Sequence, residues 1–364
     1  MQRLTPYLLG YERYMIKPGD TYETLAKAYG TDIQSLVTAN PGRDPERLPV
    51  GEYLTVPFGF PVVPTQMDFT SQLLELSSRG LRARYPFITQ ETLTHTAFGR
   101  PVNMLKIGTG QRSVLYNASH HANEWITTPL VMKFLEDYAK AVSEGSTILG
   151  MDARRLFRST QLYLVPMVNP DGVDLVTGAI DPSSFQYAQA QSIAQGYPNI
   201  PFPEGWKANL MGVDLNLNYP AGWTQARENK AALGITGPAP RDFVGWAPLD
   251  QPETIAMAAL TERVNPRLTI SFHTQGEVIY WKFLDMEPPG ARAIGERFAQ
   301  VSGYLLEDTP FASGFAGYKD WFIQEYNRPG YTIEAGLGEN PLPIGQFDSI
   351  YEKILGILVL GLTL

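Results

Sequence analysis

Two of the four histidines in this chain stand side by side in the segment ASHHANEWITTP (118–129), and a glutamate follows them. His121 and Glu124 lie where an apolar strand is expected to turn into a helix, and the two-residue gap lets both side chains reach one ion. Alone, an H-x-x-E pair is weak evidence, because it arises by chance in many chains. A metal site therefore needs a third ligand from elsewhere in the sequence.

His273 supplies that third ligand. It ends the apolar run LTISFH (268–273), and α/β proteins place their sites at strand ends. A single histidine there is more often a satisfied core residue. However, Glu334 also puts a carboxylate inside the apolar run YTIEAG, where a buried charge is costly unless it is paired or near a metal. One shared site explains His121, Glu124, His273 and Glu334 better than four separate accidents.

The elements that must position these residues alternate along the chain. Helices are expected over 68–84 and 124–142, and buried strands over 113–119, 161–169, 267–273 and 330–336. Such alternation predicts an α/β sheet covered by helices on both faces. The apolar C-terminal run 354–364 is too short for a bilayer, which takes about 20 residues, so a buried helix is expected.

The first residues read as a separate small unit of strand, helix, helix and strand. A strand is expected at 14–16, and Asp20 is expected to cap the following helix, with Glu23 three residues later. A core of this size is only marginally stable by itself. The proline-bearing segment FGFPVVPT (58–65) then suits a linker.

The amino-acid composition of the chain disfavours several classes of function. The 364 residues are 44% apolar and 18% charged, which is typical of a folded protein. The net charge of −8 gives no electrostatic case for nucleic acid or an anionic membrane as a partner. The chain has no cysteine and no G-x-S-x-G motif, which disfavours cysteine and serine hydrolase mechanisms. No signal peptide is evident, so a cytoplasmic or cell-wall-associated protein is expected.

Two family resemblances follow from these motifs. The pieces YMIKPGDTYETLAKAYG, TANP and LPVGEYLTVP resemble the lysin motif (LysM), which implies binding to N-acetylglucosamine-containing glycans such as peptidoglycan; a structural cap without ligand is the alternative. The pieces HHANEW, VNPDG, GVDLNLN, SFHTQGE and YTIEAG resemble the zinc carboxypeptidase family. The expected domains are LysM at 1–57, a linker at 58–67 and a peptidase at 68–364, with a mixed eight-stranded sheet of the carboxypeptidase A type.

The second resemblance implies roles for individual residues. His121, Glu124 and His273 would bind one Zn²⁺ per chain, and Glu334 would act as general base and acid. Zinc lowers the pKa of a bound water to about 7, and a nearby carboxylate can pass its proton to a leaving amine.

A cation is also needed near the negative charge of the tetrahedral intermediate. Lys207, which follows Trp206, stands where the family has an arginine with this role; a solvated surface lysine is the alternative. Asp214 in GVDLN matches the carboxylate that orients a zinc histidine.

Departures from the family pattern concern the substrate. Asn216 is kept, but Leu217 replaces the arginine that clamps a terminal carboxylate, and Asn123 replaces another arginine. The motifs WKAN, GVDLN with NYP following, FHTQGEVIYW and GYKDWF resemble the γ-D-glutamyl-diaminopimelate peptidase branch of the family, and the departures and LysM agree with that branch. The resemblance implies hydrolysis of the bond between γ-linked D-glutamate and a diamino acid in peptidoglycan stem peptides. Asn216 and Glu277 are then candidate substrate-binding residues. The alternatives are a carboxypeptidase or deacylase of the same fold, or an inactive wall-binding protein.

Overall fold

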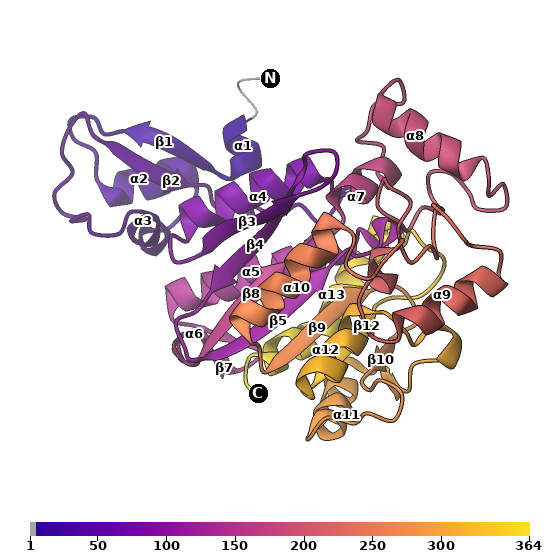
Figure 1. Cartoon of the computed structure of the whole chain (residues 1–364). Coiled ribbons are helices and arrows are strands. Elements are labelled where there is room, and N and C mark those ends of the chain that lie inside the picture. The colour runs from indigo at the N-terminus through magenta and orange to yellow at the C-terminus, as the bar shows by residue number, and fades with distance from the viewer. Residues whose placement is uncertain (1–4) are drawn as a thin grey trace.

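The computed structural model describes residues 5–364, and Figure 1 shows their arrangement. The helices are α1 (Thr5–Leu9), α2 (Tyr22–Tyr29), α3 (Ile33–Ala39), α4 (Ser71–Arg84), α5 (Thr127–Glu144), α6 (Ala153–Ser159), α7 (Pro170–Val176), α8 (Phe185–Ala194), α9 (Trp223–Ala232), α10 (Pro252–Val264), α11 (Ala291–Ser302), α12 (Tyr318–Tyr326) and α13 (Phe347–Gly361). The strands are β1 (Tyr11–Met15), β2 (Tyr53–Pro57), β3 (Thr89–His95), β4 (Pro101–Ile107), β5 (Arg112–Ala118), β6 (Thr147–Ile148), β7 (Met151–Asp152), β8 (Thr160–Val165), β9 (Leu268–His273), β10 (Val278–Tyr280), β11 (Leu305–Glu307) and β12 (Gly330–Glu334).

The main sheet has eight strands in the order β11-β10-β12-β9-β5-β8-β4-β3. Its centre, β12-β9-β5-β8, is parallel, whereas β10 and β4 run antiparallel to β12 and β8. The predicted mixed eight-stranded sheet is therefore confirmed. Because parallel strands end at one edge, the carboxyl ends of β5, β9 and β12 lie together there.

Apolar clusters cover both faces of the sheet. On β5, Tyr116 belongs to the cluster that includes α5 and α13, whereas its neighbour Leu115 belongs to the cluster that includes α10 and α12. This alternation follows from the two-residue period of a strand. It explains why the central strands read as continuous apolar runs, since both of their faces are buried.

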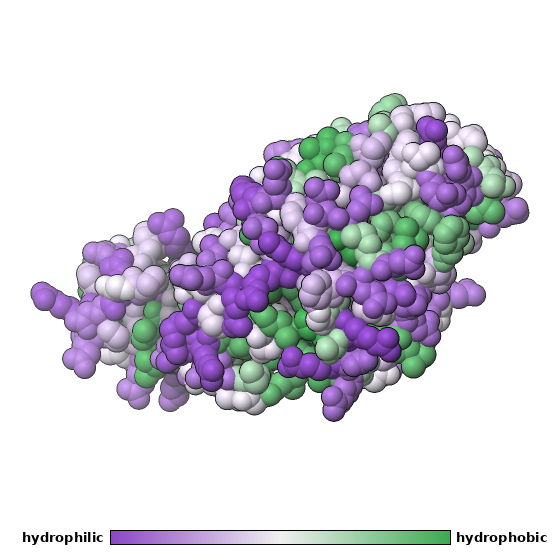
Figure 2. Space-filling view, turned by 60° about the horizontal axis from the view of Figure 1, so that its bottom comes forward, coloured by the Kyte–Doolittle hydropathy of each residue, from purple (hydrophilic) through white to green (hydrophobic). Residues whose placement is uncertain are grey.

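The C-terminal run lies in α13, where Ile354, Ile357 and Leu358 are fully buried in the apolar cluster that packs against the sheet. The expected buried helix is thus present and begins before the apolar run, at Phe347. Among residues 5–364, no helix has the length and apolarity that a membrane crossing requires. Figure 2 shows one face of the molecule, on which hydrophilic residues surround smaller hydrophobic patches.

The N-terminal unit has the expected order of strand, two helices and strand, with β1 and β2 antiparallel. The predicted cap at Asp20 is wrong: Thr21 is the N-cap of α2 and forms a capping box with Thr24. The Asp20 carboxylate instead accepts hydrogen bonds from the Lys17 backbone N–H (2.7 Å) and the Tyr14 hydroxyl (2.9 Å). It closes the turn before the helix rather than capping the helix itself.

Buried charged side chains hold this unit against the larger part of the molecule. The Arg84 guanidinium on α4 donates to the carbonyl oxygens of Gly10 (2.6 Å) and Phe58 (2.8 Å), which flank the β1–β2 pair. The Glu136 carboxylate on α5 accepts from the backbone N–H groups of Val62 (2.6 Å) and Val63 (3.2 Å). The segment predicted as a linker is therefore packed against α4 and α5, and Figure 1 shows the unit beside α4.

Candidate metal centre and active-site cleft

Three strand ends bring the candidate residues together. β5 ends at Ala118 and leads through a short turn into the 3₁₀ helix η1 (Ala122–Glu124), which follows His121 directly. β9 ends at His273, and β12 ends at Glu334, which pairs with His273 in the parallel register. Backbone hydrogen bonding of the sheet thus sets the spacing of side chains that are far apart in the sequence.

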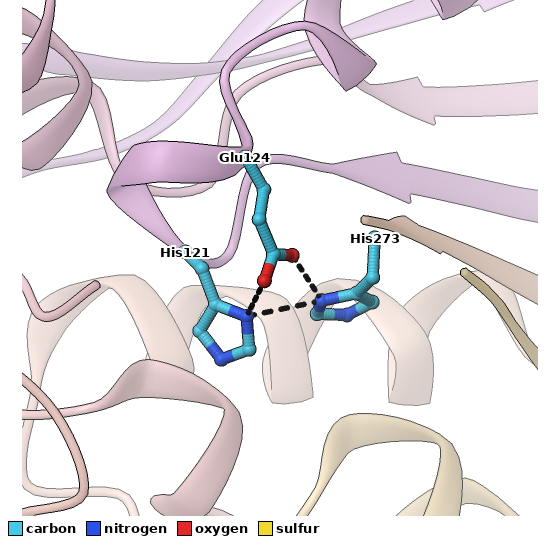
Figure 3. A group of neighbouring side chains, drawn as sticks. All are labelled: His121, Glu124 and His273. Carbon is cyan, nitrogen blue, oxygen red and sulfur yellow. Dashed lines mark hydrogen bonds and ion pairs between the residues drawn. The ribbon is translucent and has the colours of Figure 1, made fainter. Parts of the chain in front are cut away.

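His121, Glu124 and His273 converge on one point (Figure 3). The Nδ1 atom of His121 lies 2.9 Å from Glu124 Oε1, and the Nδ1 atom of His273 lies 2.8 Å from Glu124 Oε2. The two Nδ1 atoms are 3.2 Å apart. All three residues are buried, with exposures of 7%, 1% and 2% in chain order.

This donor set fits zinc. Tetrahedral zinc with Zn–N distances of about 2.0–2.1 Å separates its ligand atoms by about 3.3 Å, close to the spacing of the two ring nitrogens. Asp214 Oδ1 lies 3.1 Å from the Nε2 atom of His121 and holds the ring proton on that nitrogen, which leaves the Nδ1 lone pair directed at the shared point. Two imidazoles and one carboxylate are ligands that zinc prefers in catalytic sites.

The charges around His121 favour a cation at this point. Burial lowers the pKa of His121, but the carboxylates of Glu124 and Asp214 outweigh burial and the opposing charge of Lys207 and raise the pKa to about 9. The pKa of Glu124 falls well below its usual value, because His121, Lys207 and His273 outweigh the effect of burial. A metal ion therefore competes with protons that the two carboxylates attract, and its binding releases them.

Lys207 and Glu334 complete the inner part of the cleft. The Lys207 ammonium lies 3.2 Å from Glu124 Oε1, and its backbone carbonyl accepts the N–H of Ala122 (3.0 Å), so the same residue also holds η1. Trp206, fully buried, anchors this segment. Burial and the negative charge of Glu124 raise the pKa of Glu334 to about 8, against the opposing effects of Lys207 and His121.

Asp214 connects the metal centre to a loop that follows α9. Its carboxylate accepts the backbone N–H of Asn216 at Oδ1 (3.2 Å) and that of Asp242 at Oδ2 (3.2 Å), in addition to its contact with His121. The charge and hydrogen bond of His121, the charge of Lys207 and the N–H of Asp242 outweigh burial and lower the pKa of Asp214, so it stays ionised. Asp242 has a φ of 71°, a left-handed conformation that costs a non-glycine residue about 1–2 kcal/mol.

A cleft of about 210 Å³ opens beside these groups. Its lining includes His121, Lys207, Asp214, Asn216 and Glu334. The structure therefore brings together every residue predicted for the zinc site, the acid–base group, the electrophile and the orienting carboxylate. Asn216 also fits, and its Oδ1 atom accepts the Tyr318 N–H (3.0 Å).

Glu277 lies elsewhere. Its carboxylate is 2.5 Å from the Lys353 ammonium on α13, and it is not among the residues that line the cleft within the described part of the chain. Its substrate role stays a prediction and is left out of the function proposed below. His120, expected to be structural, is buried with its Nε2 atom 3.0 Å from the Tyr219 hydroxyl.

Sequence reasoning missed several charged residues of the cleft, namely Lys230, Arg241, Asp242, Lys319 and Asp320. Three of them come from α9 and the loop after it, and two from the start of α12. None stands in an apolar run or at a ligand-like spacing, so local sequence gave no signal for them.

Comparisons with known proteins agree with this geometry. The sequence model described as zinc carboxypeptidase matches residues 77–353, and the LysM domain model matches residues 14–57. The chain is 45% identical over 299 residues to gamma-D-glutamyl-L-diamino acid endopeptidase 1 of Lysinibacillus sphaericus, covering 82% of this chain and 73% of that protein. It is 40% identical over 277 residues to the uncharacterized protein YqgT of Bacillus subtilis, covering 75% and 72%.

Solved structures show the same fold at low sequence identity. Carboxypeptidase A from Helicoverpa armigera superimposes with a TM-score of 0.61 at 17% identity, covering 99% of this chain and 94% of that one. Thrombin-activatable fibrinolysis inhibitor gives a TM-score of 0.63 at 16% identity, covering 82% and 77%. At these identities the likeness shows the architecture alone.

Proposed function

Because the chain belongs to the zinc carboxypeptidase family, we propose that it hydrolyses the amide bond between γ-linked D-glutamate and a diamino acid in peptidoglycan stem peptides. One observation carries the proposal: the chain is 45% identical over 299 residues to a protein named gamma-D-glutamyl-L-diamino acid endopeptidase 1. The complete His121–Glu124–His273 donor set supports a catalytic rather than a purely binding role.

The residues around the donor set suit amide hydrolysis. When bound, zinc polarises the amide carbonyl and lowers the pKa of water. Glu334, which pairs with His273 in the sheet and lines the cleft, can accept the proton of the attacking water and return it to the leaving amine nitrogen. Lys207 places a positive charge beside Glu124, where it can stabilise the developing oxyanion. Asp214 fixes the orientation of the His121 ring.

The cleft is poorly suited to releasing C-terminal amino acids. Leu217, which lines it, cannot form the bidentate bond that an arginine makes with a terminal carboxylate. Asn123, buried beside the zinc ligands, is uncharged as well. These substitutions favour a substrate whose charged groups are arranged differently from those of an ordinary peptide end.

The LysM unit extends the proposal to the cell wall. We divide the chain into LysM at 1–57, a packed linker at 58–67 and the peptidase at 68–364. LysM would bind N-acetylglucosamine-containing glycan and raise the local concentration of the stem peptides attached to it. Association with the cell wall follows from that binding.

Mass spectrometry of L-Ala-γ-D-Glu-diaminopimelate digests tests this function. The zinc-loaded protein should release the diamino acid, and a chelator should stop the release until zinc is restored. An ordinary peptide with a free C-terminus serves as the comparison substrate. Release of its terminal residue, with the tripeptide left intact, would replace this proposal by a carboxypeptidase activity.

A further inference from the structure

Several positively charged side chains line the cleft, and one of them is only partly paired within the protein. Apart from Lys207, the cations of the lining among residues 5–364 are Lys230, Arg241 and Lys319. Their partners differ, and this difference separates the side chains that hold the protein together from one that is available to a ligand.

Both lysines are committed to partners within the chain. The Lys319 ammonium, 4% exposed, donates to the carbonyl of Lys282 (2.6 Å) and the hydroxyl of Thr309 (3.1 Å). It also lies 2.6 Å from Asp320 Oδ1, an ion pair whose alignment is too poor for a hydrogen bond. The Lys230 ammonium donates to Asp242 Oδ1 at 2.6 Å.

Arg241 is different. Its Nε atom donates to Asp242 Oδ2 (3.0 Å), whereas its two terminal nitrogens form no hydrogen bond with residues 5–364. The side chain is 44% exposed and lines the cleft. A guanidinium with both terminal nitrogens available presents the planar fork that binds a carboxylate through two parallel hydrogen bonds.

Arg241 is linked to the metal centre through the residue that follows it. The next residue, Asp242, has a left-handed backbone conformation, and its N–H donates to the Asp214 carboxylate. Its own carboxylate accepts hydrogen bonds from Lys230 and Arg241. Asp214 in turn contacts His121. Arg241 is therefore connected through one residue to the group that orients a metal ligand.

The substrate proposed above offers a matching group. In a γ-linked D-glutamate the scissile amide uses the side-chain carboxyl, so the α-carboxylate stays free a short carbon chain away from the reacting carbonyl. An ordinary peptide has no carboxylate there. Resting on the proposed function, we infer that Arg241 is a specificity-determining residue that binds a substrate carboxylate, the free α-carboxylate of the γ-linked D-glutamate. The carboxylate of the diamino acid is the other source of the same chemistry.

The test compares three tripeptides with the zinc-loaded full chain. The parent is L-Ala-γ-D-Glu-diaminopimelate, the second peptide carries D-isoglutamine in place of the γ-linked D-glutamate, and the third has the α-carboxylate of the diamino acid amidated. The enzymes are the wild type, Arg241→Gln, Arg241→Lys and a control, Arg227→Gln. Arg227 is exposed on α9 and lies over the Trp223 ring rather than in the cleft.

Arg241→Gln should lower kcat/KM for the parent about 10- to 100-fold, mostly through KM, because a hydrogen-bonded charge pair is lost. The wild type should lose a similar factor with the isoglutamine peptide, and the variant should no longer distinguish that peptide from the parent. Arg241→Lys should recover part of the loss. Zinc content should not change in either variant, and Arg227→Gln should match the wild type.

In another outcome, Arg241→Gln cleaves the peptide amidated at the diamino acid as well as the parent, and still distinguishes the isoglutamine peptide. In that case Arg241 binds a substrate carboxylate, but the carboxylate belongs to the diamino acid. Two results overturn the inference. In one, Arg241→Gln distinguishes the parent from each amidated peptide by the same ratio of kcat/KM as the wild type. In the other, kcat/KM falls by the same factor for all three peptides. A wild type that cleaves none of the peptides contradicts the proposed function instead, so the two failures are distinguishable.

Discussion

Glu253, outside the cleft, should make the stability of the protein depend on pH. It lies in the first turn of α10, is 1% exposed, and its Oε2 atom has no hydrogen-bond partner among residues 5–364. Burial, with a contribution from Asp171, raises its pKa from 4.5 to about 7. At 1.36 kcal/mol per pKa unit, this difference corresponds to about 3 kcal/mol of unfolding free energy.

The sign follows from proton binding. Between pH 4.5 and 7 the folded state holds more protons at Glu253 than the unfolded state does, so the stability from this group is complete below 4.5 and is lost as the pH rises to 7. Glu253→Gln removes this loss. Relative to the wild type, the variant should therefore gain about 3 kcal/mol between pH 4.5 and pH 8.

Urea unfolding followed by tryptophan fluorescence at several pH values measures this difference. Comparing variant with wild type cancels the titration of the metal centre, which both proteins share. Glu262→Gln, at an exposed position on the same helix, is the matched control and should follow the wild type. If the free-energy difference between Glu253→Gln and wild type is the same at pH 5 and pH 8, the reasoning from burial is refuted.

Three other substitutions probe the site and the N-terminal unit. Glu334→Gln should keep one zinc per chain by elemental analysis and lose about 10²- to 10⁴-fold in kcat; near-normal turnover would exclude the general-base role. Asp214→Asn should weaken zinc binding about 10- to 100-fold in competition with a chelator, and unchanged affinity would contradict its orienting role. Arg84→Met leaves the carbonyls of Gly10 and Phe58 without their donor. It should cost about 2–4 kcal/mol and speed proteolytic release of the N-terminal unit, whereas an unchanged cleavage rate would argue against that contact.

Local sequence predicted those parts of the fold that depend on local rules. The central strands were visible as apolar runs because both of their faces are buried, and the zinc ligands because polar residues at the ends of such runs are rare. The sequence alone does not decide the N-cap of α2, because Asp20 and Thr21 are both good N-cap residues. Thr21 is the cap because the turn before the helix places the Asp20 carboxylate on the backbone N–H of Lys17. The contacts of Arg84 with Gly10 and of Glu136 with Val62 could not be predicted, because each joins residues 74 positions apart.

The residues proposed for catalysis and the residue proposed for specificity also differ in how the fold positions them. His121, His273 and Glu334 lie at or just after the ends of adjacent strands, so the backbone bonds of the sheet fix their distances whatever the surrounding loops contain. Arg241 instead lies in a loop outside the sheet, next to Asp242, whose backbone N–H donates to Asp214. That bond needs no particular side chain at position 241. Recognition can therefore change while the zinc ligands keep their geometry.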